Sequence, residues 1–118
     1  MYYRNAVVWQ KAMRLALASY RLTPLLPREE VYGMRSQLTR AAISVPANVA
    51  EGWARETNAD KAHFLAIAHG SLAELETLLT LCEHLRWFPL EQTMEARALI
   101  DETSRMLTTL RRRRRKQK

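Results

Sequence analysis

Hydrophobic positions recur every three or four residues along most of this 118-residue chain, which is the period of an amphipathic α-helix. Prolines and short polar turns divide the pattern into four segments. These segments predict helices at about residues 6–22, 28–54, 58–86 and 90–113. Because the connections are short, consecutive helices are expected to lie antiparallel. The pattern therefore predicts an all-α, up-down-up-down four-helix bundle.

Local signals indicate where the helices begin. Asn5 is expected to cap the first helix, and Glu29 and Glu30 suit the N-terminal dipole of the second. Thr57 followed by Asp60 resembles a capping box at the start of the third helix. The third helix is apolar around more than one stripe, so it should contact more than one neighbour. The expected buried stripe of the second helix consists of Val31, Met34, Leu38, Ala42, Val45, Val49 and Trp53.

A proline and a glycine interrupt the second helix. Pro46 lacks an N–H for the carbonyl four residues earlier, a defect that costs about 3 kcal/mol in a helix interior. Gly52 costs about 1 kcal/mol relative to alanine there, which indicates close approach of another backbone. Gly70 is a similar feature of the third helix, so we expect the two segments to face each other.

Polar side chains accompany both of these segments. Ser44 or Asn48 is expected to reach the carbonyls that Pro46 leaves unbonded. Glu51 is spaced to pair with Arg55 one turn later, or alternatively with Arg40 of a neighbouring chain. Polar groups beside a proline more often satisfy freed backbone groups than bind a ligand. We therefore interpret the set as a structural cluster shared by the two helices. Its predicted members are Ser44, Pro46, Asn48, Glu51, Gly52, Gly70, Ser71 and Glu74.

Charge is distributed very unevenly along the chain. The formal net charge is +7, and the seven cations of residues 111–118 account for all of it. Residues 1–110 are expected to form the bundle as one domain, and residues 111–118 a basic C-terminal tail. The candidate nucleic-acid-binding residues are Arg111, Arg112, Arg113, Arg114, Arg115, Lys116 and Lys118.

Two interpretations of this tail compete. Seven cations exceed what a helix C-terminus needs for its dipole, which favours contact with the phosphates of RNA or DNA. The tail contains no aromatic residue for base stacking, so sequence-specific reading is not expected. The alternative is a protein-interaction scaffold whose tail aids solubility or docks an acidic partner. A polybasic end without a lipid or amphipathic anchor binds membranes weakly, so no membrane partner is expected.

The sequence contains no recognisable pattern of catalytic or metal-binding residues. His63, His69 and His84 lack the spacing of metal-ligand pairs, and Ser44 and Ser71 have no histidine in a predictable geometry. We therefore expect no catalytic residues, no metal site, no cofactor and no enzymatic activity. The single cysteine forms no internal disulfide and no secretion signal is evident, which favours the cytoplasm.

Three separated motifs resemble a known family. They are VWQKAM at residues 8–13, SQLTRAAISVPANVAEG at residues 36–52 and AHGSLAELE at residues 68–76. In this order they resemble the bacterial four-helix-bundle proteins encoded by intervening sequences of 23S ribosomal RNA genes. The resemblance covers roughly residues 7–88.

That resemblance implies a four-helix bundle that assembles into a homopentamer and has no established enzymatic activity. It also implies kinship with the accessory variability proteins of diversity-generating retroelements, which look like basic pentamers that bind nucleic acid and a reverse transcriptase. The chain departs from the family pattern in two places. The basic run from Arg111 to Lys116 is not part of the motif, and His69 stands where a more basic residue is expected.

Overall fold

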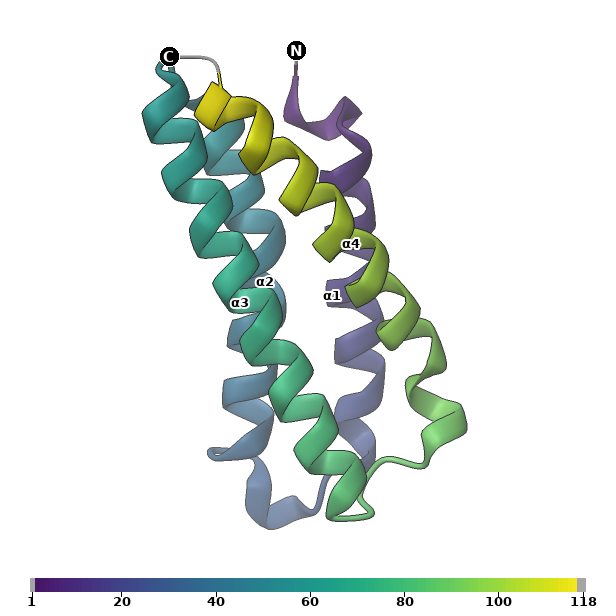
Figure 1. Ribbon diagram of the computed structural model, residues 1–118. Helices are drawn as coiled ribbons and strands as arrows, with labels where there is room; N and C mark the ends of the chain where they lie inside the picture. Colours follow the sequence, from purple (N-terminus) through teal and green to yellow (C-terminus); the bar gives the residue numbers. More distant parts are fainter. Residues whose placement is uncertain (1, 117–118) are drawn as a thin grey trace.

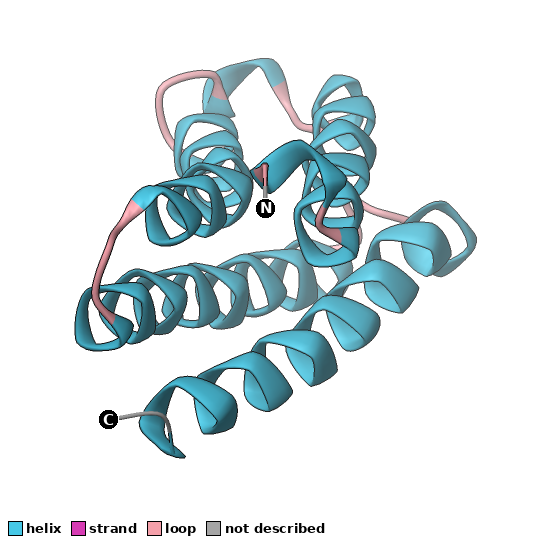
Figure 2. Ribbon diagram, turned by 90° about the horizontal axis from the view of Figure 1, so that it is seen from above, coloured by secondary structure: helices cyan, strands magenta, loops and turns pink. Residues whose placement is uncertain are grey.

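The computed structural model describes residues 2–116 and contains, within them, four long α-helices and no strand. The helices are α1 (Val7–Leu22), α2 (Met34–Ala54), α3 (Asn58–His84) and α4 (Leu90–Lys116). Both α1 and α3 contact α2 and α4, so the four helices surround one core (Figure 1). Figure 2 shows the same arrangement from above, with only short loops between the helices. The prediction of an all-α protein is confirmed.

Aliphatic side chains at the predicted periodic positions fill the core. Leu15 in α1, Leu38 in α2, Leu75 in α3 and Leu107 in α4 are all fully buried. Burying a side chain of this size contributes about 1.5–3 kcal/mol, so the four facing stripes hold the helices together. Phe88, in the turn before α4, closes one end of this core and is only 1% exposed.

The start of α2 differs from the prediction. Residues Arg28–Glu30 form a separate 3-10 turn, and α2 begins at Met34. Gly33 is the N-cap residue of α2, and the Glu30 carboxylate accepts a hydrogen bond from the Met34 N–H at 3.1 Å. Glu30 therefore satisfies the α2 N-terminus from outside the helix. Val31 consequently lies on the surface at 39% exposure, so its assignment to the buried stripe is wrong.

The other two N-terminal signals had different outcomes. Asn5 ends a 3-10 turn, and Ala6 occupies the N-cap of α1 without a side-chain hydrogen bond, so that cap prediction is wrong. The Thr57 hydroxyl accepts a hydrogen bond from the Asp60 N–H at 3.1 Å. The predicted cap of α3 is therefore confirmed.

The helix α3 is the most apolar of the four. By length and composition alone it is capable of crossing a membrane, with a mean hydropathy of 1.3 over its best window. It packs against both α2 and α4, which matches the expectation of more than one neighbour. Part of its apolar surface is used for this internal packing, whereas Ile67 and Leu81 are 38% and 45% exposed.

Candidate functional site

The seam between α2 and α3 carries a short chain of hydrogen bonds. The Ser44 and Ser71 hydroxyls lie 2.7 Å apart, and the Asn48 amide donates to both the Ser44 hydroxyl and the Ser44 carbonyl at 2.9 Å. Pro46 is buried beside them. The carbonyl that Pro46 leaves without its helical N–H belongs to Ala42, so Asn48 serves a neighbouring carbonyl instead. The structure brings together Ser44, Asn48 and Ser71.

Other residues of the predicted cluster lie apart from this chain of bonds. Glu51 is exposed and pairs with Arg55 at 2.6 Å, within α2. Glu74 and Gly70 are exposed, and a Cβ at Gly70 would meet nothing within 4 Å. A Cβ at Gly52, in contrast, would lie 3.3 Å from the Lys61 carbonyl oxygen. The close backbone approach predicted at Gly52 is present, whereas Gly70 faces open space.

The basic run forms the last turns of α4 rather than a separate tail. The helix continues to Lys116, three residues beyond the predicted boundary, and Lys118 lies outside the described residues. Arg111 and Arg114 are half-buried. The exposed members of the run are Arg112, Arg113, Arg115 and Lys116, and we call these four residues the basic end of α4.

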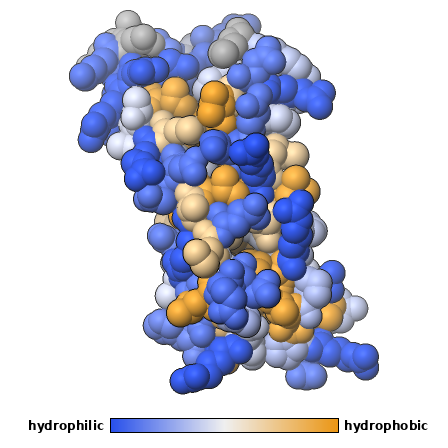
Figure 3. Space-filling view, turned by 90° about the vertical axis from the view of Figure 1, so that its right-hand side faces the viewer, coloured by the Kyte–Doolittle hydropathy of each residue, from blue (hydrophilic) through white to orange (hydrophobic). Residues whose placement is uncertain are grey.

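The basic end lies at the same end of the bundle as the start of α1 (Figure 1). Figure 3 shows the side of the molecule formed by α1 and α4, where hydrophilic atoms predominate and hydrophobic atoms gather in separate patches. No ion pair involves the basic end within residues 2–116. The nearest acid before it on α4, Glu102, pairs with Lys11 at 2.7 Å. Its positive charge is therefore not neutralised inside the described fold.

A histidine anchors the beginning of the basic run to α3. Arg111 donates a hydrogen bond to the His69 Nδ1 at 3.0 Å, and the His69 Nε2 lies 3.1 Å from the Ser104 hydroxyl. Because a guanidinium only donates, Nδ1 must be unprotonated, and Nε2 carries the hydrogen in neutral His69. Burial and then the nearby Arg111 charge lower the pKa of His69. This contact fixes where the last turns of α4 lie relative to α3.

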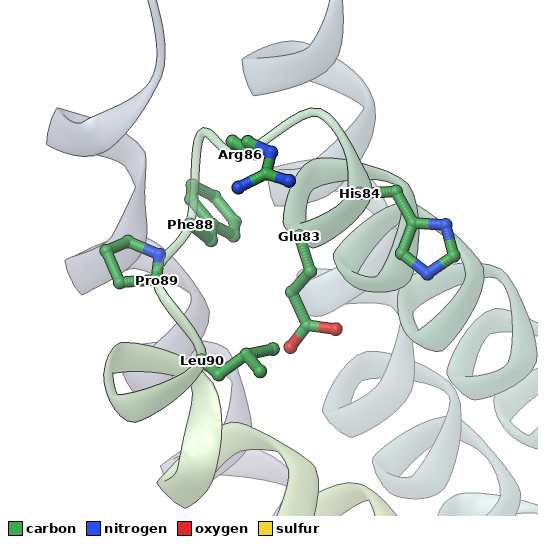
Figure 4. Close-up of a pocket in the computed structure, with 6 residues that line it drawn as sticks. All are labelled: Glu83, His84, Arg86, Phe88, Pro89 and Leu90. Atoms are coloured by element: carbon green, nitrogen blue, oxygen red, sulfur yellow. The ribbon is translucent and has the colours of Figure 1, made fainter.

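The opposite end of α4 holds a pocket of about 690 Å³ beside the α3–α4 turn. Figure 4 shows its lining, with Glu83 and His84 from α3, Arg86, Phe88 and Pro89 from the turn, and Leu90 from α4. Arg97 donates to both oxygens of the Glu83 carboxylate, and Thr93 donates to one of them. The Arg97 hydrogen bond is the main cause of a lowered pKa of Glu83. This carboxylate is fully engaged in holding α3 to α4.

The described residues offer little reaction chemistry. Within residues 2–116 no three histidine, cysteine or carboxylate side chains are grouped so that they could hold a metal ion. Cys82 is buried, which raises the pKa of its thiol to about 11 and suppresses the reactive thiolate.

Sequence reasoning missed the polar contacts that join α3 to α4, and two of them show why. Glu83 and Arg97 are 14 residues apart and lie on different helices, and His69 and Arg111 are 42 residues apart. Neither pair has a helical spacing of three or four residues, so the local pattern carries no signal for it. Only the packing of the two helices places these side chains together.

Comparison with known proteins identifies relatives of the same fold. The family model described as 23S rRNA-intervening sequence protein matches residues 4–109. A crystal structure of a protein with unknown function from the S23 ribosomal protein family of Bacteroides thetaiotaomicron VPI-5482 superposes with a TM-score of 0.81 at 25% identity. The match covers 89% of this chain and 98% of that one. No curated protein is significantly similar to the chain.

Proposed function

The chain belongs to the 23S rRNA-intervening sequence protein family, and from that premise we propose that it is a non-enzymatic, oligomeric helical protein that binds nucleic acid through the basic end of α4. The description of the matched family names no enzymatic activity, and the similar structure is described as having unknown function. The proposal therefore rests on the site itself rather than on the family.

The exposed and unneutralised charge of the basic end is the observation that supports the proposal. Arg112, Arg113, Arg115 and Lys116 follow one another within about one and a half helical turns, and no acid lies among them. Phosphate contact by such a group releases counterions, so affinity should fall steeply with salt. The group carries no base-reading geometry, so we propose binding to RNA or DNA without sequence preference.

We further propose that the bundle is antiparallel and assembles into a homopentamer. The contacts between α3 and α4 support the antiparallel arrangement, because Glu83 pairs with Arg97 whereas the earlier His69 contacts the later Ser104. The pentamer is carried over from the family resemblance. A pentamer would present five basic ends, and multivalency would strengthen a weak single contact by orders of magnitude. The cytoplasm is the proposed location, and a reverse transcriptase or another protein is a further proposed partner.

The test compares two variants with the same loss of charge. In the first, the four residues of the basic end are replaced by glutamine. In the matched control, four exposed arginines elsewhere are replaced by glutamine, namely Arg14, Arg28, Arg35 and Arg40. Binding of the full chain to duplex DNA, single-stranded RNA and structured RNA is measured at low salt by fluorescence anisotropy.

We expect the basic-end variant to lose at least tenfold in affinity for all three nucleic acids, and the control variant to lose much less. Equal losses in the two variants would show that only overall charge matters and would contradict the assignment of the site. If the unaltered protein binds none of the three at low salt, the scaffold function replaces the proposed one. Light scattering tests the pentamer separately, because a monomer at micromolar concentration would refute it.

A further inference from the structure

An apolar groove lies beside the basic end of α4. It has a volume of about 600 Å³ and runs between the start of α1, the end of α2 and the last turns of α4. Its apolar wall includes Val7, Trp53, Met106 and Leu110. Trp53, Met106 and Leu110 are partly buried and pack against the core, whereas Val7 is 55% exposed. The groove thus offers an apolar surface backed by the rigid interior of the bundle.

One edge of the groove is positively charged. Arg105, Thr109 and Arg113 are spaced four residues apart on α4 and follow this edge for about 12 Å, which is eight residues of helical rise. No acidic residue lines the groove. Arg105 pairs with Asp101 at 2.8 Å, but both side chains are about two-thirds exposed, so this pair is weak and readily exchanged.

We propose that this groove binds an amphipathic, acidic α-helix of a partner protein. Two turns of a docked helix match the length of the arginine edge, and their apolar side chains would cover the wall at the spacing typical of helix-in-groove recognition. Acidic side chains flanking that apolar face would pair with Arg105 and Arg113. The charge of the edge and the apolar wall together select this occupant.

Nucleic acid fits the groove less well than such a helix. A phosphate backbone gains nothing from an apolar wall, and the indole of Trp53 is partly buried against the core rather than presented as a stacking surface. The proposed nucleic-acid function uses the exposed cations, so the groove is a separate feature that shares only Arg113 with it.

A second copy of this chain is the other possible occupant. The start of α4 presents Leu90 and Met94, which are 68% and 69% exposed, beside Glu91 and Glu95. Figure 1 shows the two ends of α4, and this segment lies at the end opposite to the residues of α4 that line the groove. Such a contact is head-to-tail, so it closes into a ring only at particular rotations between copies and otherwise extends into an open filament. A helix from a different protein forms a discrete complex, and we commit to it.

The probe is a synthetic helical peptide with leucines at positions i, i+3, i+4 and i+7 and glutamates on both flanks. A peptide of the same composition in scrambled order has the same charge but no apolar face. Binding of each labelled peptide to the full chain is measured by fluorescence anisotropy. We expect the scrambled peptide to bind at least tenfold more weakly, and equal binding would overturn the proposal.

Two pairs of variants locate the peptide. Thr109→Glu places an acid in the arginine edge, and Thr77→Glu is its control, since both threonines are exposed and bond the carbonyl four residues earlier. Val7→Asp alters the apolar wall, and Leu17→Asp is its control at a similar 52% exposure outside the groove. We expect at least a tenfold loss of peptide affinity in Thr109→Glu and Val7→Asp, and less than a twofold change in the controls.

Circular dichroism checks that each variant is folded, and duplex DNA binding is measured in parallel. We expect Val7→Asp to retain its DNA affinity, so failure of the groove proposal and failure of the proposed function are distinguishable. Unchanged peptide affinity in folded Thr109→Glu and Val7→Asp would overturn the groove proposal. It would also be overturned if these two variants lost self-association that the controls retain, because a second copy would then be the occupant.

Discussion

The two ends of α4 both carry arginines, but only one end supplies them with a carboxylate. At the turn end, Arg97 donates to the nearly buried Glu83, whose side chain is 6% exposed. At the other end, Arg111 donates to a neutral histidine, and Arg112, Arg113 and Arg115 are exposed without an ion pair in the described fold. Arg97 is used by the fold, whereas Arg112, Arg113 and Arg115 remain solvated.

This difference separates a structural role from the proposed binding role within one helix. Removal of one partner of a paired, desolvated charge is destabilising, because it leaves the other charge uncompensated. A charge that remains solvated contributes little to stability, but it attracts a polyanion. Substitutions at the turn end should therefore lower the stability of the protein, whereas substitutions at the basic end should weaken binding and leave the stability nearly unchanged.

The largest effect on stability is expected for Arg97→Ala. It leaves the Glu83 carboxylate in a poorly solvated site with only Thr93 as a donor. Loss of one partner of such a pair should lower the free energy of unfolding by about 2–3 kcal/mol. Urea denaturation followed by circular dichroism measures the change.

The matched substitution at the basic end is Arg112→Ala. Arg112 is exposed and has no ion pair within the described residues, so its loss should change the free energy of unfolding by less than about 0.5 kcal/mol. If both substitutions destabilise the protein equally, the distinction between the two ends fails.

A smaller effect, a gain in stability, is expected for Arg86→Gly at the turn end. Arg86 has a φ of 63°, the left-handed region that favours glycine, and the Trp87 N–H bonds back to the Cys82 carbonyl as in a Schellman motif. Relief of this strain should raise the free energy of unfolding by about 0.5–1 kcal/mol. Arg112→Gly, placed inside α4 instead, should lose stability, and thermal melts of the two variants check the opposite signs.

The smallest expected effect is a change of the free energy of unfolding with pH, caused by His69 beside the basic end. The lowered pKa of His69 means that the native state favours the neutral imidazole. The unfolded chain therefore binds more protons as pH falls below about 6.5, so stability should decrease between pH 7.5 and 5.5. The depressed pKa of Glu83 acts only at lower pH and does not contribute in this window.

His69→Gln should reduce this pH dependence, since glutamine does not titrate. His63→Gln is the control, because His63 is exposed and has no hydrogen bond to α4 within the described residues. Urea midpoints at the two pH values measure the difference. An unchanged slope in His69→Gln would contradict the role assigned to the His69–Arg111 contact.

The helices were predictable because their apolar positions repeat locally. Leu38, Val45 and Val49 of α2 are buried as the periodicity requires, and Thr57 caps α3 as its spacing with Asp60 indicates. The start of α2 was not predictable, because Glu30 bonds Met34 across Gly33 instead of joining the helix. Tertiary geometry decided that boundary rather than helix propensity.

The candidate site was predictable only in part. Charge composition locates the basic run, and the proline segment indicates the contact of Ser44 with Ser71. Composition does not show that Arg111 is bound by His69, or that α4 remains helical to Lys116. Those features depend on how far α3 extends alongside α4, which no local pattern encodes.

The salt dependence of duplex DNA binding tests the central claim most directly. Loss of about four phosphate contacts per chain should make the slope of log affinity against log salt shallower by about 3–4 in the variant with glutamine at Arg112, Arg113, Arg115 and Lys116. The control with glutamine at four other exposed arginines should keep nearly the slope of the unaltered protein. Identical slopes for the two variants would contradict the claim that the basic end of α4 contacts the nucleic acid.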